Sequence, residues 1–349
     1  MSKSNAYRKY ANYLTALLLF SVSIWILSAL RPLQMPDEYT PACLYATQVG
    51  DDLKQLYLQA TDEAGSSILL MIYALVDAQL IQKLKEKSEQ GVNVHVVCDP
   101  TASPRIARKL GPKVRLIRRH GKGLMHHKIL VVDRLKVWGG SANWTGESLR
   151  FHGNLVIGVA SEPLAAEMER YAELLSTPRN KFELHPKNYI IGEQSVEVWL
   201  MPNPRVVKRL LDIIQQAEKT VRVAMFTWTH LDLAQAVVEA NQRGVDTAVV
   251  IDRYAGKGAG AKVVNFLKEK GVSVRLSQGN ALLHHKFLYV DGKTVVNGSA
   301  NWTKAAFSKN DDCLFILHHL TMHQKQKIDL LWQSIFRNSC EESNDEMAL

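Results

Sequence analysis

The chain has 349 residues and a hydrophobic share of 46%, which suits two ordinary domains or one duplicated domain and argues against broad disorder. Its formal net charge of +9 favours polyanionic partners (nucleic acid, anionic lipid or phosphate-rich substrates) and does not choose among them. The four cysteines are scattered, with no CxxC pair, which argues against a zinc or dithiol redox site. No metal-ligand cluster is evident, so neither a metal nor another cofactor is expected. Cys98 and Cys313 stand in apolar, strand-like runs and are expected to be buried.

The first predicted element is an apolar run over residues 14–30, which basic residues precede and Arg31 ends. As a helix it would span roughly 26 Å, at the short end for crossing a bilayer. No clear A-x-A cleavage site follows, which favours an uncleaved signal anchor over a removed signal peptide, although a cleaved and secreted form stays open. The positive charge before the run predicts a cytoplasmic N-terminus, with the body on the periplasmic, lumenal or extracellular side. A buried core helix fits the basic flanks poorly.

After the anchor, two long stretches repeat the same order of elements. Residues 66–77 and 219–230 are strand-like, and each leads through a helical pattern to a glycine (Gly91, Gly244) and a further apolar strand. Strands that alternate with helices predict an α/β fold with a mixed sheet flanked by helices, present twice. The predicted divisions are 1–31 (anchor), 32–42 (linker), 43–182 (first half), 183–195 (join), 196–338 (second half) and 339–349 (acidic tail).

Each half then carries one copy of the same motif with identical spacing, HHKILVVDRLKVWGGSANWT and HHKFLYVDGKTVVNGSANWT. The shared positions are His126, Lys128, Asp133, Gly140, Ser141 and Asn143 in the first copy, and His284, Lys286, Asp291, Gly298, Ser299 and Asn301 in the second. The histidine and lysine share one strand face, and a returning strand brings the serine and asparagine beside them. The glycine before the serine allows a tight turn and a close backbone approach to a ligand. Two imidazoles, two ammonium groups and two amides can therefore converge on one phosphate.

Both segments read H-x-K-x4-D-x6-G-S-x-N, which resembles the signature of the phospholipase D superfamily, and the GSANWT wording is most similar to its compact bacterial endonuclease-like and mitochondrial branches. The resemblance extends over nearly the whole chain after the anchor. It implies two phospholipase D-type α/β sandwich halves related by a pseudo-two-fold axis, with a single active site between them. Because the chain carries both copies, it is expected to act as a monomer.

The resemblance also implies a metal-independent mechanism in two steps. One histidine attacks phosphorus to give a phosphohistidine, and the other protonates the leaving oxygen and then activates water or an acceptor alcohol. The groups expected to bind the phosphate are Lys128, Lys286, Asn143, Asn301, Ser141 and Ser299. Asp133 and Asp291 look structural in this family, and the middle residues His127 and His285 are expected to point to the opposite strand face as buried histidines.

In the family an acidic or amide side chain after the motif serine often supports the imidazole, and counting here leads to Asn154 in the first half and Asp312 in the second. An amide orients a ring without charging it, whereas a carboxylate raises the pKa of the imidazole. We therefore predict that Asn154 keeps His126 neutral as the nucleophile and that Asp312 keeps His284 protonated as the acid. This assignment agrees with the usual order in the family.

Three weaker signals accompany the motif. A basic stretch before His126 predicts a rim for phosphate-bearing substrate, with an ordinary solvated loop as the alternative; it comprises Arg115, Arg118, Arg119, His120 and Lys122. Residues 256–262 lack the P-loop spacing and indicate a flexible loop near the mouth of the cleft. Trp144 and Trp302 are expected to pack beneath the site rather than line an acyl channel.

Together these features predict a membrane-anchored phosphodiesterase, bound to the membrane through residues 14–30, that hydrolyses or transphosphatidylates phospholipids. The alternative is a membrane-anchored endonuclease of the same superfamily that acts on DNA or RNA. The anchor favours lipid because it holds the site close to a bilayer. A scaffold with a degenerate site is disfavoured, since every signature position is intact in both halves.

Overall fold

The computed structural model describes residues 33–177 and 185–341, together with Tyr13, Thr15, Leu17 and Phe20. The chain divides into two units, residues 1–34 and residues 35–349. Apart from those four residues, which are helical, the predicted anchor lies outside the described residues, as do residues 342–349 of the tail. Within the part of the chain that is described, no helix is long and apolar enough to cross a bilayer. The anchor therefore stays a prediction.

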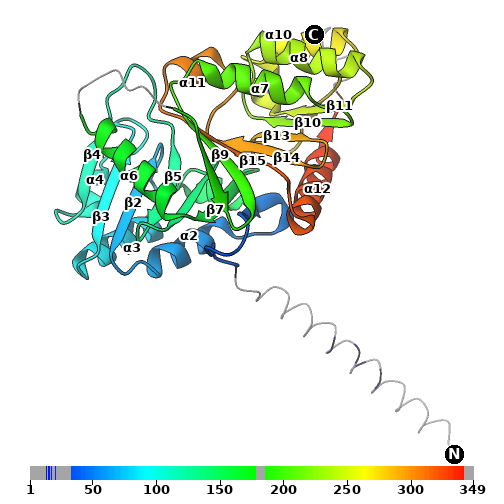
Figure 1. The fold of residues 1–349 in the computed structure, drawn as a ribbon. Coiled ribbons are helices and arrows are strands. Elements are labelled where there is room, and N and C mark those ends of the chain that lie inside the picture. Colours follow the sequence, from blue (N-terminus) through cyan, green and yellow to red (C-terminus); the bar gives the residue numbers. More distant parts are fainter. Residues whose placement is uncertain are drawn as a thin grey trace, which may run out of the picture. The chain divides into compact units, whose positions relative to one another are not determined.

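The first half of the second unit contains a seven-stranded mixed sheet in the order β1-β7-β6-β5-β2-β3-β4 (Figure 1). Its strands are β1 (Cys43–Ala46), β2 (Ser67–Ile72), β3 (Asn93–Cys98), β4 (Arg115–Arg118), β5 (Lys128–Val132), β6 (Lys136–Gly140) and β7 (Leu155–Ala160). Its helices are η1 (Thr47–Val49), α2 (Leu53–Asp62), α3 (Ala78–Glu89), α4 (Ile106–Leu110), α5 (Gly146–Arg150) and α6 (Glu162–Leu175). Strands β2, β3 and β4 are parallel, whereas β5, β6 and β7 form an antiparallel meander that begins beside β2.

The second half repeats this plan in a nine-stranded sheet, ordered β16-β12-β11-β10-β13-β14-β15-β9-β8. Its strands are β8 (Lys187–Ile191), β9 (Gln194–Leu200), β10 (Thr220–Met225), β11 (Asp246–Ile251), β12 (Ser273–Ser277), β13 (Lys286–Val290), β14 (Thr294–Gly298), β15 (Cys313–Leu317) and β16 (Ser339–Cys340). Its helices are α7 (Arg205–Gln215), α8 (Leu231–Gln242), α9 (Arg253–Lys257), α10 (Ala261–Glu269), α11 (Lys304–Ser308) and α12 (Met322–Arg337). The predicted α/β class, with two mixed sheets and flanking helices, is confirmed.

The structure differs from the prediction in three segments. Strand β8 lies within the predicted join, because it pairs with β9 at the edge of the second sheet. Strand β16 lies within the predicted tail and extends the opposite edge by pairing with β12. The predicted loop 256–262 is shorter in the structure: residues 258–260 form a turn between α9, which ends at Lys257, and α10, which begins at Ala261.

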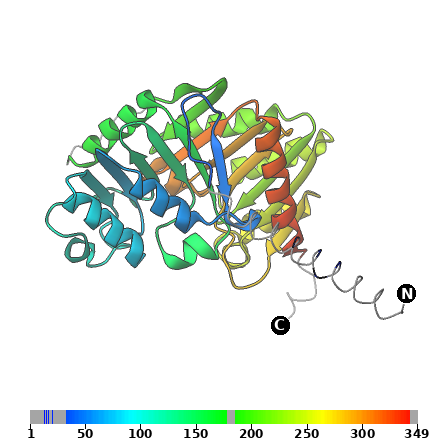
Figure 2. The ribbon, with the colours of Figure 1, turned by 90° about the horizontal axis from the view of Figure 1, so that it is seen from below.

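The two sheets meet through a shared apolar core, where β6 and β7 contact β14 and β15 (Figure 2). The approach is close: a Cβ at Gly139 would lie 2.3 Å from the ring of Phe315. Helices α6 and α12 contribute Met168 and Leu331 to the same core. Cys98 and Cys313 are buried as expected, and the four cysteines are free. This packing sets the starts of β5 and β13, and thus both motif histidines, against the opposite half.

Threonines of the two motifs also shape the local fold. Thr145 caps α5 by accepting the N–H of Ser148 at 3.2 Å, and Thr303 caps α11 by accepting the N–H of Ala306 at 3.2 Å. After each short helix the chain turns back into β7 or β15. Asn154 and Asp312, which directly precede these strands, contact the motif histidine of the other half.

Candidate active site

The two motif histidines and lysines form one buried cluster. His126 and His284 are each 7% exposed, and Lys128 and Lys286, at the first positions of β5 and β13, are 2% and 1% exposed. The charges of Lys286, Lys128 and His126 all act on His284, so groups from both halves share one space. Aromatic rings that follow β2 and β10 flank this space, with Tyr73 5.0 Å from the ring of His126 and Phe226 5.0 Å from that of His284.

Each imidazole is supported by a residue of the opposite half. Nδ1 of His126 lies 2.8 Å from Oδ1 of Asp312, and Nδ1 of His284 lies 3.1 Å from Oδ1 of Asn154. The prediction that each residue supports the histidine of its own half was wrong. The chain exchanges partners because the turn before β15 is hydrogen-bonded to the first motif: the N–H of His126 donates to the carbonyl of Asp311 at 2.8 Å. Both Nδ1 atoms face acceptors, so a neutral ring carries its proton on Nδ1 and leaves Nε2 free.

The motif serines are buried and bind these supporting residues. Oγ of Ser141 donates to Oδ1 of Asn154 at 2.8 Å, and Oγ of Ser299 donates to Oδ1 of Asp312 at 2.6 Å. Both serines are 0% exposed, and each hydroxyl also accepts a backbone N–H from the next strand. The serines therefore position the supporting residues and do not line the phosphate site, which corrects the prediction.

Both lysines are buried, and neither forms an ion pair among the described residues. Nζ of Lys128 donates to the carbonyl of His126 at 2.6 Å, and Nζ of Lys286 donates to that of His284 at 2.9 Å. Burial lowers the pKa of Lys128 to about 7, and burial followed by the charge of Lys128 lowers that of Lys286 well below its usual range. An anion placed between them would relieve this cost.

The two imidazoles differ in their electrostatic surroundings. Burial, followed by Lys128, lowers the pKa of His126, while the carboxylate of Asp312 opposes that shift. Burial and then Lys286 lower the pKa of His284 well below its usual value, and the charges of Lys128, His126 and His152 lower it further. Although burial alone would raise it, His126 lowers the pKa of Asp312, so the carboxylate is ionised. Both imidazoles are therefore neutral near pH 7, and the carboxylate of Asp312 contacts one of them.

The family model described as "Cardiolipin synthase, PLD-like domain" matches residues 57–175 and again residues 210–332, together more than half of the chain. The chain belongs to this family. It is therefore a member of the phospholipase D superfamily, and each half contains one phospholipase D-like domain.

Known relatives agree with this membership. Mitochondrial cardiolipin hydrolases of Chlamydomonas reinhardtii and Xenopus tropicalis are 31% identical over 131 residues and 33% identical over 127 residues. These matches cover 37% and 36% of this chain, and 58% and 60% of the hydrolases, so the chain spans a little over half of their length. Cardiolipin synthase B of Salmonella typhi is 23% identical over 343 residues, 85% of this chain and 81% of that protein. The phosphatidylserine synthase of Haemophilus influenzae shares the fold, with a TM-score of 0.66 and 12% identity over 82% of this chain and 84% of that one.

The two asparagines of the phospholipase D-like motifs are half-buried. Oδ1 of Asn301 accepts the N–H of Thr227 at 3.3 Å, which fixes the amide and leaves its Nδ2 free to donate. Oδ1 of Asn143 is buried and has no partner among the described residues. Their place as phosphate ligands stays a prediction.

Other motif positions support the strands. The carboxylate of Asp133 accepts three backbone N–H groups of residues 65–67, and that of Asp291 accepts three of residues 218–220. Although burial alone would raise it, these bonds lower the pKa of each carboxyl, as expected for a structural residue. A Cβ at Gly140 or Gly298 would lie 2.3 or 2.1 Å from a carbonyl oxygen at the start of the next strand. These glycines therefore allow the close approach of a neighbouring strand, and not of a ligand as predicted.

The middle histidines and the tryptophans of the motifs are buried away from the cluster, as predicted. Nε2 of His127 lies 3.1 Å from the hydroxyl of Tyr171, and Nε2 of His285 lies 2.6 Å from Oε1 of Gln48. Trp144 packs on the ring of Tyr57, and Trp302 packs on that of Trp228.

Sequence reasoning missed several positioning residues. Oδ2 of Asp99 accepts the N–H of Met125 at 3.3 Å, and Oδ2 of Asp252 accepts that of Leu283 at 2.9 Å, directly before the two motif histidines. The recurrence of these aspartates at the ends of β3 and β11 was a usable signal. His152, whose ring centroid lies 6.3 Å from that of His284, had no such signal because the repeat has Asn310 at that position.

The predicted basic rim is smaller than expected. Arg115 is paired with Glu173 away from the site, and Arg119 is 8% exposed with its Nε 3.3 Å from Oδ2 of Asp311. Arg118, His120 and Lys122 remain exposed.

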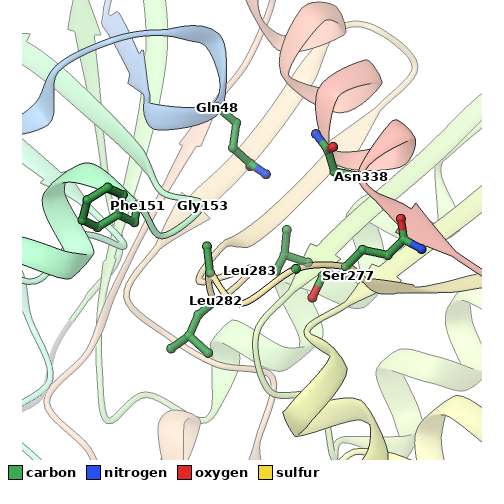
Figure 3. Close-up of a pocket in the computed structure, with 10 residues that line it drawn as sticks. Gln48, Phe151, Gly153, Ser277, Leu282, Leu283 and Asn338 are labelled. Atoms are coloured by element: carbon green, nitrogen blue, oxygen red, sulfur yellow. The ribbon is translucent and has the colours of Figure 1, made fainter.

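A cavity of about 290 Å³ lies beside the loop that precedes His284 (Figure 3). Phe151 and Gly153 lie on one side of it, Asn338 on another, and Leu282 and Leu283 between them. At the equivalent place before His126 the Arg119–Asp311 pair is present. The corresponding residues beside the cavity are Ser277, in place of Arg119, and Gly153, in place of Asp311. The two sides of the site are therefore not alike.

Proposed function

We propose that this protein is a phospholipase D-type phosphodiesterase that hydrolyses phospholipids, or transfers their phosphatidyl group to an alcohol, through a phosphohistidine and without a metal ion. One observation carries the proposal: each imidazole presents a free Nε2 while its Nδ1 is held by the opposite half, beside two buried lysines. The names of the related lipid enzymes support a phospholipid substrate.

In the first step Nε2 of His126 attacks phosphorus, and the bond to the leaving oxygen breaks. The ring becomes a cationic phosphoimidazolium, and the carboxylate of Asp312 on Nδ1 stabilises the charge as it develops. His284 donates the proton from its Nε2 to the leaving alcohol. The bound phosphodiester supplies a negative charge that raises the pKa of His284 and lets it hold that proton.

In the second step the neutral His284 takes a proton from water or from an acceptor alcohol. The oxygen attacks phosphorus, the P–N bond breaks, and His126 is released neutral. Lys128 and Lys286 stabilise the negative charge on the equatorial oxygens in both steps, with the amides of Asn143 and Asn301. Because either oxygen nucleophile can complete this step, hydrolysis and transfer share one site.

We further propose that the two halves are related by a pseudo-two-fold axis and form the site within one chain, which then acts as a monomer. The crossed pairs His126–Asp312 and His284–Asn154 support this, since each contact recurs with the halves exchanged. Attachment through residues 14–30, with the body on the non-cytoplasmic side, completes the proposal.

A substrate panel tests the proposed function. The protein is incubated with labelled phosphatidylcholine, cardiolipin and single-stranded DNA, each with and without EDTA. We expect phosphatidic acid or phosphatidyl transfer products, no DNA cleavage, and no effect of EDTA. DNA cleavage without lipid turnover would instead support the endonuclease, which the basic balance of the chain also suits. Loss of activity in EDTA would contradict the metal-free mechanism.

A further inference from the structure

The internal repeat provides a control for the surroundings of the site. In the segment before His126, the residues Arg118, Arg119, His120 and Lys122 occupy the positions that Leu276, Ser277, Gln278 and Asn280 occupy before His284. One copy is therefore basic at four positions where the other has no basic residue. A charge that the shared chemistry required would stand in both copies, so the difference concerns what approaches the site from outside.

A fifth basic residue joins this side from the other half. The loop at Gly123 packs on the turn after α11, since a Cβ at Gly123 would lie 2.7 Å from the carbonyl oxygen of Lys309. The N–H of Leu124 also binds Oδ1 of Asn310 at 3.1 Å. The position of Lys309 is taken by Phe151 in the repeat. We call the exposed residues Arg118, His120, Lys122 and Lys309 the basic edge.

The basic edge has no acidic ion-pair partner within the described part of the chain. Asp311, a carboxylate on the adjoining turn, is paired with the buried Arg119. Among the described residues no carboxylate forms an ion pair with Arg118, Lys122 or Lys309. The basic edge therefore presents uncompensated positive charge beside the segment that leads to His126.

Exposed apolar side chains accompany this charge near both motif histidines, and we call the surface formed by these side chains and the basic edge the mouth of the site. Leu124, two residues before His126, is 43% exposed, and Phe151, in the turn that leads to Asn154, is 65% exposed. Figure 3 shows Phe151 and Leu282 at different places on the lining of the cavity. Cations next to outward apolar side chains suit the boundary between lipid headgroups and acyl chains. A nucleic acid backbone would leave Leu124 without a partner.

We propose that the mouth of the site is a docking surface for an anionic bilayer, in which the basic edge binds lipid phosphates while Leu124 and Phe151 enter the headgroup layer. The two contributions to membrane binding can be measured separately. Binding through the basic edge requires anionic lipid and weakens with salt, whereas binding through the apolar side chains occurs on any bilayer. This surface goes beyond the proposed reaction, and its occupancy can be measured without turnover.

The test is vesicle flotation with residues 35–349, a unit with its own apolar cores. A His126→Ala background prevents lipid turnover, so binding is read even if the proposed function fails. Vesicles contain phosphatidylcholine alone or with phosphatidic acid. The double variant Lys122→Asn/Lys309→Asn should bind the anionic vesicles about 25-fold more weakly at low salt and the neutral vesicles unchanged, because each basic residue near an anionic surface contributes about fivefold.

Matched controls isolate the surface. Lys109→Asn/Lys270→Asn removes the same charge from exposed positions on α4 and after α10 and should retain anionic binding. Phe151→Asn should weaken binding to both kinds of vesicle, whereas Ile190→Asn, 69% exposed on β8, should not. Equal losses in the two lysine variants would reduce the effect to net charge and overturn the proposal. Loss of single-stranded DNA binding with unchanged vesicle binding would make the basic edge a nucleic-acid surface instead.

Discussion

The carboxylate of Asp312 lies 2.8 Å from Nδ1 of His126, although the two residues belong to opposite phospholipase D-like halves. The same carboxylate oxygen accepts the hydroxyl of Ser299 at 2.6 Å. The second chain of contacts, Ser141 to Asn154 to His284, has the same form and a neutral amide at its centre. Of two otherwise equivalent histidines, His126 therefore contacts a carboxylate and His284 contacts a neutral amide.

This inequality keeps the proposed roles of the histidines but changes the reason for them. A nucleophilic imidazole gains positive charge as it bonds to phosphorus, so a carboxylate on its Nδ1 stabilises the transition state. An acid that must release its proton is better served by a neutral partner, because a carboxylate would hold the imidazolium. His126 with Asp312 suits the first task, and His284 with Asn154 suits the second.

The first prediction concerns these two partners. Asp312→Asn removes the charge behind the nucleophile at nearly constant shape, and we expect kcat to fall by about 10²-fold or more. The matched change Asn154→Asp adds a charge behind the acid. It should raise the pKa of His284 and move the alkaline limb of the pH–rate profile upward, with a much smaller loss of rate. Profiles of kcat/KM against pH for both variants provide the measurement, and equal losses in the two would contradict the division of roles.

A second prediction locates the covalent bond. An activated substrate such as bis(4-nitrophenyl) phosphate has a leaving group that needs little protonation, so His284→Ala should still complete the first step and then stall. We expect a burst of one nitrophenolate per chain and an added phosphoryl ester mass on the peptide that contains His126. His126→Ala should give neither. An adduct on His284 in the His126→Ala protein would reverse the roles.

The serines offer a third, paired comparison. Ser299 donates to a carboxylate and Ser141 to a neutral amide, and hydrogen bonds to charged groups are worth about 1.5–3 kcal/mol against about 0.5–1.5 for neutral ones. Ser299→Ala should therefore lower kcat and the melting temperature more than Ser141→Ala does. Steady-state kinetics and thermal unfolding of the two variants decide this. If the serines instead bound phosphate, KM would rise similarly in both.

Much of the fold and the cluster was predictable because the motif and its flanking elements occur twice in the sequence. The strand-like run before Asp133, for example, is confirmed as β5, and its alternation correctly turned His127 away from Lys128. The structural use of Asp133 and Asp291, which the family resemblance implied, agrees with their bonds to residues 65–67 and 218–220. The alternation along β5 acts over a few residues and depends on nothing more distant.

The partner exchange could not be predicted in the same way. Counting from Ser141 reaches Asn154 correctly, and the two residues are hydrogen-bonded. Whether that amide then meets His126 or His284 depends on how two sheets pack, and no spacing within one copy records it. The burial of Arg119 against Asp311 has the same origin, since that pair joins segments from opposite halves.

A fourth prediction separates structure from chemistry at the hairpin aspartates. Asp133→Ala leaves three backbone N–H groups of residues 65–67 without their acceptor and should cost roughly 2–3 kcal/mol of unfolding free energy. Asp291→Ala should behave alike at residues 218–220. In chemical denaturation both midpoints should fall, while kcat per folded molecule and its pH dependence stay unchanged. A large loss of kcat in fully folded protein would instead place these carboxylates in the reaction.

The last prediction follows from the burial of Lys128, which lowers its pKa to about 7 in the folded protein from an ordinary value of 10.5. Between these values the unfolded chain binds a proton that the folded protein does not, so the free energy of unfolding should rise with pH. Raised pKa values of buried thiols and tyrosines oppose this at higher pH, which leaves a window from about pH 7 to about 8.5. Within it we expect an increase on the order of 1 kcal/mol.

Lys128→Met should reduce this pH dependence without abolishing it, because the buried Lys286 also has a lowered pKa. It should also raise stability near neutral pH, because an apolar side chain of similar length replaces a buried cation. Lys219→Met, at an exposed position, should leave the slope as it is. Inorganic phosphate should reduce the slope in the wild-type protein, since a bound anion restores the charge of the buried lysines, and should have a smaller effect in Lys128→Met. Urea unfolding across the window measures all three, and a phosphate effect of equal size in Lys128→Met would mean that the anion binds elsewhere.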